Sequence, residues 1–247
     1  MAEWDHKGSS SVEKPRCSGR GHYSILTEFR RRLARRALRE NAGVEQRNSN
    51  EPRPDASRSD PTRPDGRRPR IYLAGPDVFF PDARQIFDAL KAHCARLGLE
   101  GVEPSDGGIG AGFQGSDDEM AQRIYDGNMA LIRGADGVIA NLVNFRGHEP
   151  DSGTVFEVGV AIALGKPVVA YGVAEGTYAD RVSAVVPCTK DAAGVLREVA
   201  SGVTVEGLGQ RLNLMLTRSA CIEPTAEAAV DRMLELLAPR ATALEVK

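Results

Sequence analysis

From residue 70 onward, short apolar runs alternate with longer segments whose apolar residues repeat at helical spacing. The runs predict strands at 70–75, 136–142 and 166–172, and the periodic segments predict helices at 82–97, 118–133, 153–165 and 225–240. The runs are apolar throughout, which is typical of parallel strands that are buried on both faces. We therefore expect an α/β fold, a flavodoxin-like or Rossmann-like doubly wound parallel sheet, with its ligand at the carboxyl ends of the strands.

The first 70 residues differ from the rest in charge and composition. They carry 17 Lys and Arg against 10 Asp and Glu, a net charge of +7, whereas residues 71–247 carry 15 against 24, a net charge of −9. Residues 42–70 have almost no apolar side chain to bury, which predicts disorder, and residues 24–40 place apolar residues on one stripe among arginines, which predicts a possible helix. We therefore expect a basic, largely disordered extension at 1–69 and a folded domain at 70–242.

Several classes of protein are disfavoured by what the sequence lacks. No apolar run approaches the ~20 residues of a membrane-spanning helix, and the first residues lack the apolar region of a secretory signal. Cys17, Cys94, Cys188 and Cys221 are widely separated and form no C-x-x-C or Cys/His cluster. No G-x-G-x-x-G turn follows a strand. We expect reduced thiols, no metal site, a cytoplasmic location, and neither a membrane nor a nucleic acid as partner.

The loop after the second predicted strand leads into a helix and holds the best candidates for chemistry. Asp151 precedes this helix, where a carboxylate caps free backbone N–H groups or binds a ligand. Glu157 shares a helical face with Val160, Ala161 and Leu164, and this is the face that the helix must bury. An ionised carboxylate there is unfavourable unless it is paired or used, so Glu157 is either a nucleophile or general base, or part of a salt bridge.

Four segments of the folded region resemble the nucleoside 2-deoxyribosyltransferases. They are IYLAGPDVF (71–79), NMALIRGADGVIANL (128–142), FRGHEPDSGTVFEVGVAIALGKPVV (145–169) and LNLM (212–215). The third segment is the most specific, and the resemblance extends over roughly residues 70–240. It implies an enzyme of nucleotide metabolism, such as purine salvage, that transfers 2-deoxyribose between nucleobases without a metal or an organic cofactor.

The resemblance also implies roles for single residues. Glu157, the glutamate of the family's D-x-G-x-x-x-E motif, is the nucleophile, Asp151 opens the motif and helps to bind the deoxyribose, and Tyr72 lies close to the nucleophile. The turn after the first strand lines the base pocket with Gly75, Pro76, Asp77 and Phe79. Asn213 is expected to reach the site of a neighbouring subunit and hold the sugar 5′-hydroxyl, which implies a homo-oligomer, either a dimer or a hexamer.

One position departs from the lactobacillus-type members of the family. Those enzymes carry an acid on the helix before the second strand, and the matching residue here is Asn128. An amide hydrogen-bonds a purine edge but does not supply a proton as a carboxylic acid does, and a buried core amide is the other interpretation. Protonation of the departing base then falls to Asp77 or to a water molecule. The Gly-rich loop at 105–116 is either a cover for the site or a surface connection.

The implied reaction is cleavage of the N-glycosidic bond with retention at C1′, through a covalent glycosyl-glutamate. Two alternatives stay open, a 2′-deoxynucleoside 5′-monophosphate N-glycosidase that transfers the sugar to water, and a non-catalytic nucleotide-binding module. The glycosidases carry a G-S-I-R-G-like turn that holds phosphate, where this chain has GPDVF with the acidic Asp77. Purine or pyrimidine preference stays open as well.

Overall fold

A computed structural model of the chain describes residues 66–104 and 113–238. Three expected features lie wholly or mostly outside the described residues: the basic extension with its candidate helix at 24–40, most of the Gly-rich loop at 105–116, and the end of the proposed domain at 239–242. Within the described part, no helix combines the length and the apolar character needed to cross a membrane.

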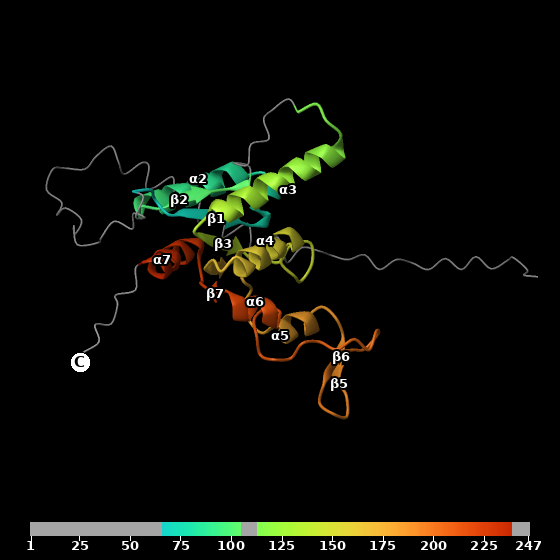
Figure 1. Ribbon diagram of the computed structural model, residues 1–247. Helices are drawn as coiled ribbons and strands as arrows, with labels where there is room; N and C mark the ends of the chain where they lie inside the picture. Colours follow the sequence, from blue (N-terminus) through green and yellow to red (C-terminus); the bar gives the residue numbers. More distant parts are fainter. Residues whose placement is uncertain (1–65, 105–112, 239–247) are drawn as a thin grey trace, which may run out of the picture. The chain divides into compact units, whose positions relative to one another are not determined.

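Five parallel strands form the central sheet, in the order β2-β1-β3-β4-β7. Figure 1 labels β2, β1, β3 and β7 of this sheet. They are β1 (Arg70–Ala74), β2 (Glu100–Val102), β3 (Gly137–Asn141), β4 (Val168–Tyr171) and β7 (Cys221–Ile222). This is the strand order of flavodoxin, so the predicted doubly wound α/β fold is confirmed. The sequence pattern did not reveal β2 and β7, because they have only three and two residues.

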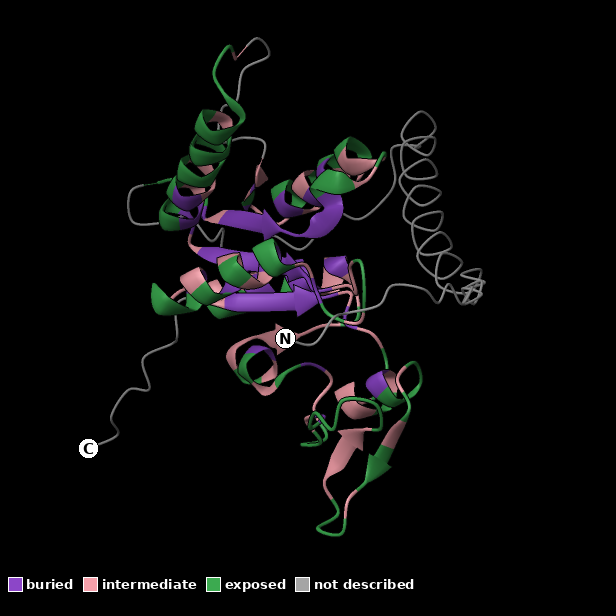
Figure 2. Ribbon diagram, turned by 90° about the vertical axis from the view of Figure 1, so that its right-hand side faces the viewer, coloured by how far each residue is buried: buried purple, intermediate pink, exposed green. Residues whose placement is uncertain are grey.

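Helices cover both faces of this sheet. The helices α3 (Asp117–Gly134), α4 (Ser152–Ala163) and α6 (Leu214–Ser219) pack on one face, and α2 (Ala83–Arg96) and α7 (Ala226–Leu237) pack on the other. Along β1, Tyr72 and Ala74 belong to the core under α3 and α4, while Ile71 and Leu73 belong to the core under α2 and α7. The three central strands, β1, β3 and β4, are buried almost along their whole length (Figure 2), which explains the uninterrupted apolar runs.

Side chains cap the N-termini of α4 and α7, and the cap expected at Asp151 is confirmed. The Asp151 side chain accepts a hydrogen bond from the backbone N–H of Thr154 at 2.9 Å, at the start of α4. Thr225 accepts from the backbone N–H of Ala228 at 3.1 Å, at the start of α7. Each side chain satisfies one of the N–H groups that the first turn of a helix leaves without a partner.

Two apolar side chains of the helices are exposed, and one of them, Leu164, was expected on a buried helix face. Ile124 on α3 is 42% exposed, and Leu164 at the end of α4 is 47% exposed. With 18 residues, α3 is about 27 Å long, whereas the five residues of β1 span only about 16 Å. The first turns of α3 therefore have no sheet beneath them. Helical periodicity predicts which face of a helix is apolar, but it does not predict where the helix extends beyond the end of the sheet.

The segment between β4 and α6 adds structure that the periodicity did not predict. A short helix, α5 (Tyr178–Ser183), is followed by the antiparallel pair β5 (Cys188–Lys190) and β6 (Leu196–Glu198), which forms a separate two-stranded sheet. The cysteines of the described residues, Cys94, Cys188 and Cys221, are free thiols.

Candidate active site

The carboxyl ends of β1 and β3 mark the place where this fold opens a crevice. β1 leads into α2 on one face of the sheet and β3 leads into α4 on the other, so the two connections diverge between neighbouring strands. Divergence of this kind is the usual location of a ligand site in an open α/β sheet. The turn after β1 and the loop from Leu142 to Asp151 after β3 therefore flank the expected site.

Three of the expected site residues meet on the α3–α4 face of β1. The Tyr72 hydroxyl on β1 donates a hydrogen bond to Glu157 Oε1 on α4 at 2.6 Å. Asn128 Nδ2 on α3 donates to the same oxygen at 3.5 Å. The ring of Tyr72 is fully buried, so its hydroxyl is fixed in place by the core of the sheet. Both donors engage one oxygen of Glu157, and Oε2 accepts no hydrogen bond from the described residues.

The environment of Glu157 changes its acidity. Burial raises the pKa of the carboxyl to about 7, the hydrogen bond from Tyr72 opposes this shift, and the negative charge of Asp151 adds to it. Burial and the neighbouring Glu157 raise the pKa of Tyr72 above its ordinary value, so this hydroxyl stays protonated as a donor. A partly buried carboxyl group that titrates near neutral pH beside the carboxyl ends of the strands is suited to nucleophilic or acid–base chemistry.

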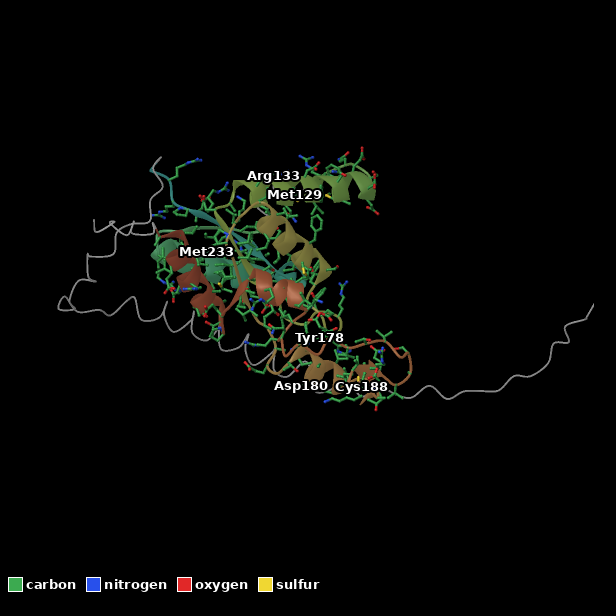
Figure 3. All side chains as sticks on the ribbon, turned by 60° about the horizontal axis from the view of Figure 1, so that its bottom comes forward. Met129, Arg133, Tyr178, Asp180, Cys188 and Met233 are labelled. Carbon is green, nitrogen blue, oxygen red and sulfur yellow. The ribbon has the colours of Figure 1, made fainter. Side chains whose placement is uncertain are left out.

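Asp151 combines the capping role with an electrostatic one. Its Oδ2 accepts from the backbone N–H of Thr154 at 2.9 Å and from the Thr154 hydroxyl at 3.0 Å. The preceding loop is held to α5, because the hydroxyl of Tyr178 donates a hydrogen bond to Glu149. Tyr178 is labelled in Figure 3. This bond is the largest contribution that raises the pKa of Tyr178 to about 12. Asp151 is thus positioned from both sides, by its own helix and by the loop that leads to it.

The turn after β1 buries a carboxylate. Gly75 leads into a 3-10 helix, η1 (Pro76–Phe79), in which Asp77 is only 5% exposed. Asn141, the last residue of β3, donates through Nδ2 to both carboxylate oxygens of Asp77, at 2.9 and 3.1 Å. Position 75 requires glycine, since a Cβ there would lie 2.4 Å from Asp77 Oδ2 and 2.9 Å from Asn141 Cβ. This pair joins the two loops that flank the crevice.

The family model for nucleoside 2-deoxyribosyltransferases matches residues 71–215, a segment that contains all of the residues described above. The chain belongs to this family. Its sequence is 36% identical, over 115 residues, to an uncharacterized protein of Schizosaccharomyces pombe, a match that covers 46% of this chain and 54% of that protein. The chain thus spans about half the length of this curated relative.

A solved deoxyribosyltransferase shares the fold. A 2-desoxiribosyltransferase from Leishmania mexicana is 30% identical with a TM-score of 0.54, and the match covers 68% of this chain and 97% of that chain. A 2-deoxyribosyltransferase from Bacillus psychrosaccharolyticus is 24% identical with a TM-score of 0.35, over 41% of this chain and 71% of that one. The Leishmania protein is matched over nearly its whole length, so this chain shares the fold of that protein.

In this deoxyribosyltransferase domain, an aromatic stack bridges the two loops at the mouth of the crevice. The rings of Phe79 and Phe145 are stacked with centroids 5.5 Å apart and planes at 21°, and Phe80 meets Phe145 edge-on at 6.2 Å. The Arg146 guanidinium lies 4.7 Å from the centroid of Phe145 and 5.7 Å from that of Phe79. Phe79 is nevertheless 60% exposed, so much of its ring is available to a ligand.

Arg146 also has an unusual backbone. Its φ of 54° makes it the only non-glycine residue with a positive φ in the described part of the chain. This left-handed conformation is unfavourable by about 1–2 kcal/mol for a residue with a Cβ. The loop is closed behind it by a hydrogen bond from Phe145 N to Glu149 O at 2.9 Å and by a bridge between Asn144 and Pro150. The closed loop therefore imposes the conformation that brings the guanidinium over the rings.

Asn213 lies apart from the hydrogen bonds around Glu157. It is exposed and caps α6, where its Oδ1 accepts from Met215 N at 3.0 Å. Its Nδ2 donates to Glu206 Oε2 at 3.0 Å, and Glu206 Oε1 accepts from Leu214 N at 2.7 Å. Its amide is therefore held at the surface by Glu206, and its expected role in the site of a neighbouring subunit stays a prediction.

Three residues of this arrangement were not singled out by sequence reasoning. Asn141 carries a visible signal, because it is the polar residue at the end of an otherwise apolar strand. Phe145 and Arg146 open the most specific of the family segments, but nothing in the sequence pairs them with Phe79. These contacts join loops that are more than 60 residues apart in the chain, as the Asn141–Asp77 bond illustrates with a separation of 64.

Proposed function

We propose that this chain transfers 2-deoxyribose between nucleobases through a covalent ester on Glu157, with retention at C1′. One observation carries the proposal. The glutamate of the family motif accepts a 2.6 Å hydrogen bond from a fully buried tyrosine, and the pKa of its carboxyl is raised to about 7. Family membership supports the general type of chemistry, cleavage of an N-glycosidic bond.

In the first half of the proposed reaction, Glu157 Oε2 attacks C1′ of a 2′-deoxynucleoside. The bond between C1′ and the base nitrogen breaks, its electron pair leaves with the base, and an ester forms between C1′ and Glu157. Tyr72 and Asn128 support this step, because their hydrogen bonds to Oε1 orient the carboxylate and leave Oε2 toward the sugar. The transition state has oxocarbenium character, which a carboxylate beneath the sugar ring stabilises.

In the second half, a nitrogen of the incoming base attacks C1′ from the face that the first base left. The ester bond breaks, Glu157 regains its charge, and the base nitrogen releases its proton to water. Two inversions give overall retention. The departing base takes up a proton in the first half, and we assign this proton to a water molecule or to Asp77. The burial of Asp77 and its two hydrogen bonds from Asn141 favour the water molecule.

We propose that the Phe79–Phe145 stack is the platform for the base. It lies on the two loops that flank the crevice, and Phe79 keeps most of its ring exposed. Stacking of a base on an aromatic ring contributes about 1–3 kcal/mol and tolerates different bases, as a transferase that accepts more than one base requires. Arg146 holds the rings together from its place over both.

The role proposed for Asn213 requires a second copy of the chain. Its exposed position and its orientation by Glu206 are consistent with an amide presented to a neighbour. We therefore propose a homo-oligomer, a dimer or a hexamer, in which Asn213 binds the 5′-hydroxyl of the sugar in the neighbouring site. Asn213→Ala should raise KM for the deoxynucleoside while the pKa seen in the pH profile stays unchanged.

The test is a base-exchange assay followed by HPLC. The purified protein is incubated with 2′-deoxyinosine or thymidine, with and without free adenine, beside a Glu157→Ala variant and a surface control, Glu235→Gln. Formation of 2′-deoxyadenosine only with adenine, its loss in Glu157→Ala and its retention in the control support the proposal. Base release that is independent of adenine identifies a hydrolase instead, with 5′-monophosphates as the next substrates. Full activity of Glu157→Ala contradicts the mechanism.

A further inference from the structure

A cavity lies at the edge of the sheet opposite the candidate active site. Its volume is about 560 Å³, and it opens where β1, β2, β3 and β4 begin rather than where they end. Five basic side chains line it: Arg67, Arg68, Arg70, Arg133 and Lys166. Figure 3 labels Arg133 at the C-terminal end of α3. The full length of β1, about 13 Å from its first to its last Cα, separates this edge from the turn at Gly75.

Only part of this positive charge is neutralised. Two acidic residues, Glu100 and Asp136, also line the cavity, so the lining carries a net charge of +3. Glu100 Oε1 lies 3.3 Å from Arg70 Nε, and Asp136 Oδ2 accepts from the Arg70 backbone N–H at 2.8 Å. In residues 66–104 and 113–238, neither Arg68 nor Arg133 pairs with an acidic side chain. Two guanidinium groups are therefore left for an external anion.

The other cations of the cavity show how it is built. Lys166 Nζ donates to the backbone carbonyls of Arg133 and Ala135, so it neutralises the negative end of α3. Without this lysine, the carbonyls would repel an anion that approached Arg133. Arg70 Nε is buried and makes no hydrogen bond, although Glu100 is near. A buried N–H of this kind is unfavourable unless a ligand or a water satisfies it.

We propose that this cavity is a binding site for a polyphosphate anion. Guanidinium groups bind phosphate oxygens through paired hydrogen bonds, and several of them around one cavity suit a ligand with several negative charges. The volume lies within the roughly 300–1,000 Å³ of small-molecule sites, so inorganic pyrophosphate and a nucleoside triphosphate both fit. The site is separate from Glu157, and the proposal does not depend on the deoxyribosyltransferase reaction.

The test is calorimetric titration of the full-length protein with pyrophosphate and, separately, with ATP, at low ionic strength. The decisive variant is Arg68→Gln/Arg133→Gln, which removes the two unpaired guanidinium groups at exposed positions. Arg84→Gln/Arg232→Gln is the matched control, because it removes the same charge from α2 and α7, away from the cavity. We expect the first variant to weaken pyrophosphate binding by at least about tenfold, since both substitutions remove charge-assisted hydrogen bonds to phosphate oxygens.

Each outcome decides the question. Loss of binding in Arg68→Gln/Arg133→Gln with parental affinity in the control supports the site. Tighter binding of ATP than of pyrophosphate means that the nucleoside also occupies the cavity, whereas equal affinities mean that only the polyphosphate group is recognised. The proposal is overturned if the parent protein binds neither anion, or if both double variants bind as the parent does or lose affinity equally.

Discussion

Removing the Tyr72 hydroxyl should shift the pH dependence of the reaction. The proposed nucleophile must be ionised, and the pKa of Glu157 is raised to about 7, so kcat/KM should rise with pH through that value. Tyr72 stabilises the ionised form through its 2.6 Å hydrogen bond and thereby lowers the pKa of Glu157. Tyr72→Phe keeps the buried ring but removes this donor, so the pKa of Glu157 should move upward.

The size of the shift follows from the strength of the bond. A hydrogen bond to a charged group contributes about 1.5–3 kcal/mol, and one pKa unit corresponds to about 1.4 kcal/mol. The acid limb should therefore move by roughly one to two units, from about 7 to about 8–9. At neutral pH the variant should also be slower, because most of its Glu157 is protonated. The buried ring of Tyr72 still fills its place in the core, so folding should change little.

The assay measures kcat/KM for base exchange from about pH 5 to about pH 10, the range that brackets the expected limb. Tyr125→Phe is the control, because Tyr125 is an exposed residue of α3 whose hydroxyl does not bond Glu157, and its profile should match that of the parent. An acid limb at the same pH in Tyr72→Phe and in the parent would refute the assigned role of the Tyr72–Glu157 bond. A shift to lower pH would refute the sign of the electrostatic argument.

Three further predictions concern stability and base binding. Glu157→Gln should abolish transfer yet raise the free energy of unfolding by up to about 3 kcal/mol near pH 8 and by less near pH 5. The reason is that the folded state holds this carboxyl protonated up to about pH 7, whereas the unfolded chain ionises it near pH 4.5. Urea titrations with equal gains at both pH values would contradict this. Asn141→Ala should lower the free energy of unfolding by on the order of 2 kcal/mol, since buried Asp77 loses two hydrogen bonds, and the exchange variant Asp77→Asn/Asn141→Asp should restore most of it; an undisturbed denaturation midpoint in Asn141→Ala would argue against the pair. Phe145→Ala should raise KM for the acceptor base about fivefold to tenfold with a smaller change in kcat. Arg146→Gly should raise this KM as well, and it should stabilise the fold by about 1 kcal/mol because glycine tolerates the positive φ. Steady-state kinetics with unchanged KM in both variants would rule out the base platform.

The sequence by itself determined the class of the fold and the centre of the site. Uninterrupted apolar runs between helical segments predicted parallel strands buried on both faces, and the sheet has this form. The charged Glu157 near an apolar helix face stood out because burial of an unpaired carboxylate is unfavourable, and the family motif around it is local in the chain. Caps such as Asp151 were also predictable, because a cap acts within one helical turn.

Only the tertiary structure decided which loops meet and how far burial extends. The exposure of Ile124 follows from the length of α3 relative to the sheet, which no local period encodes. The pairing of Asn141 with Asp77 and the stacking of Phe145 on Phe79 depend on two loops that become neighbours because β1 and β3 lie side by side. Sequence periodicity reports which face of each element is buried, whereas contacts between distant loops arise from strand order, and strand order is a property of the assembled sheet.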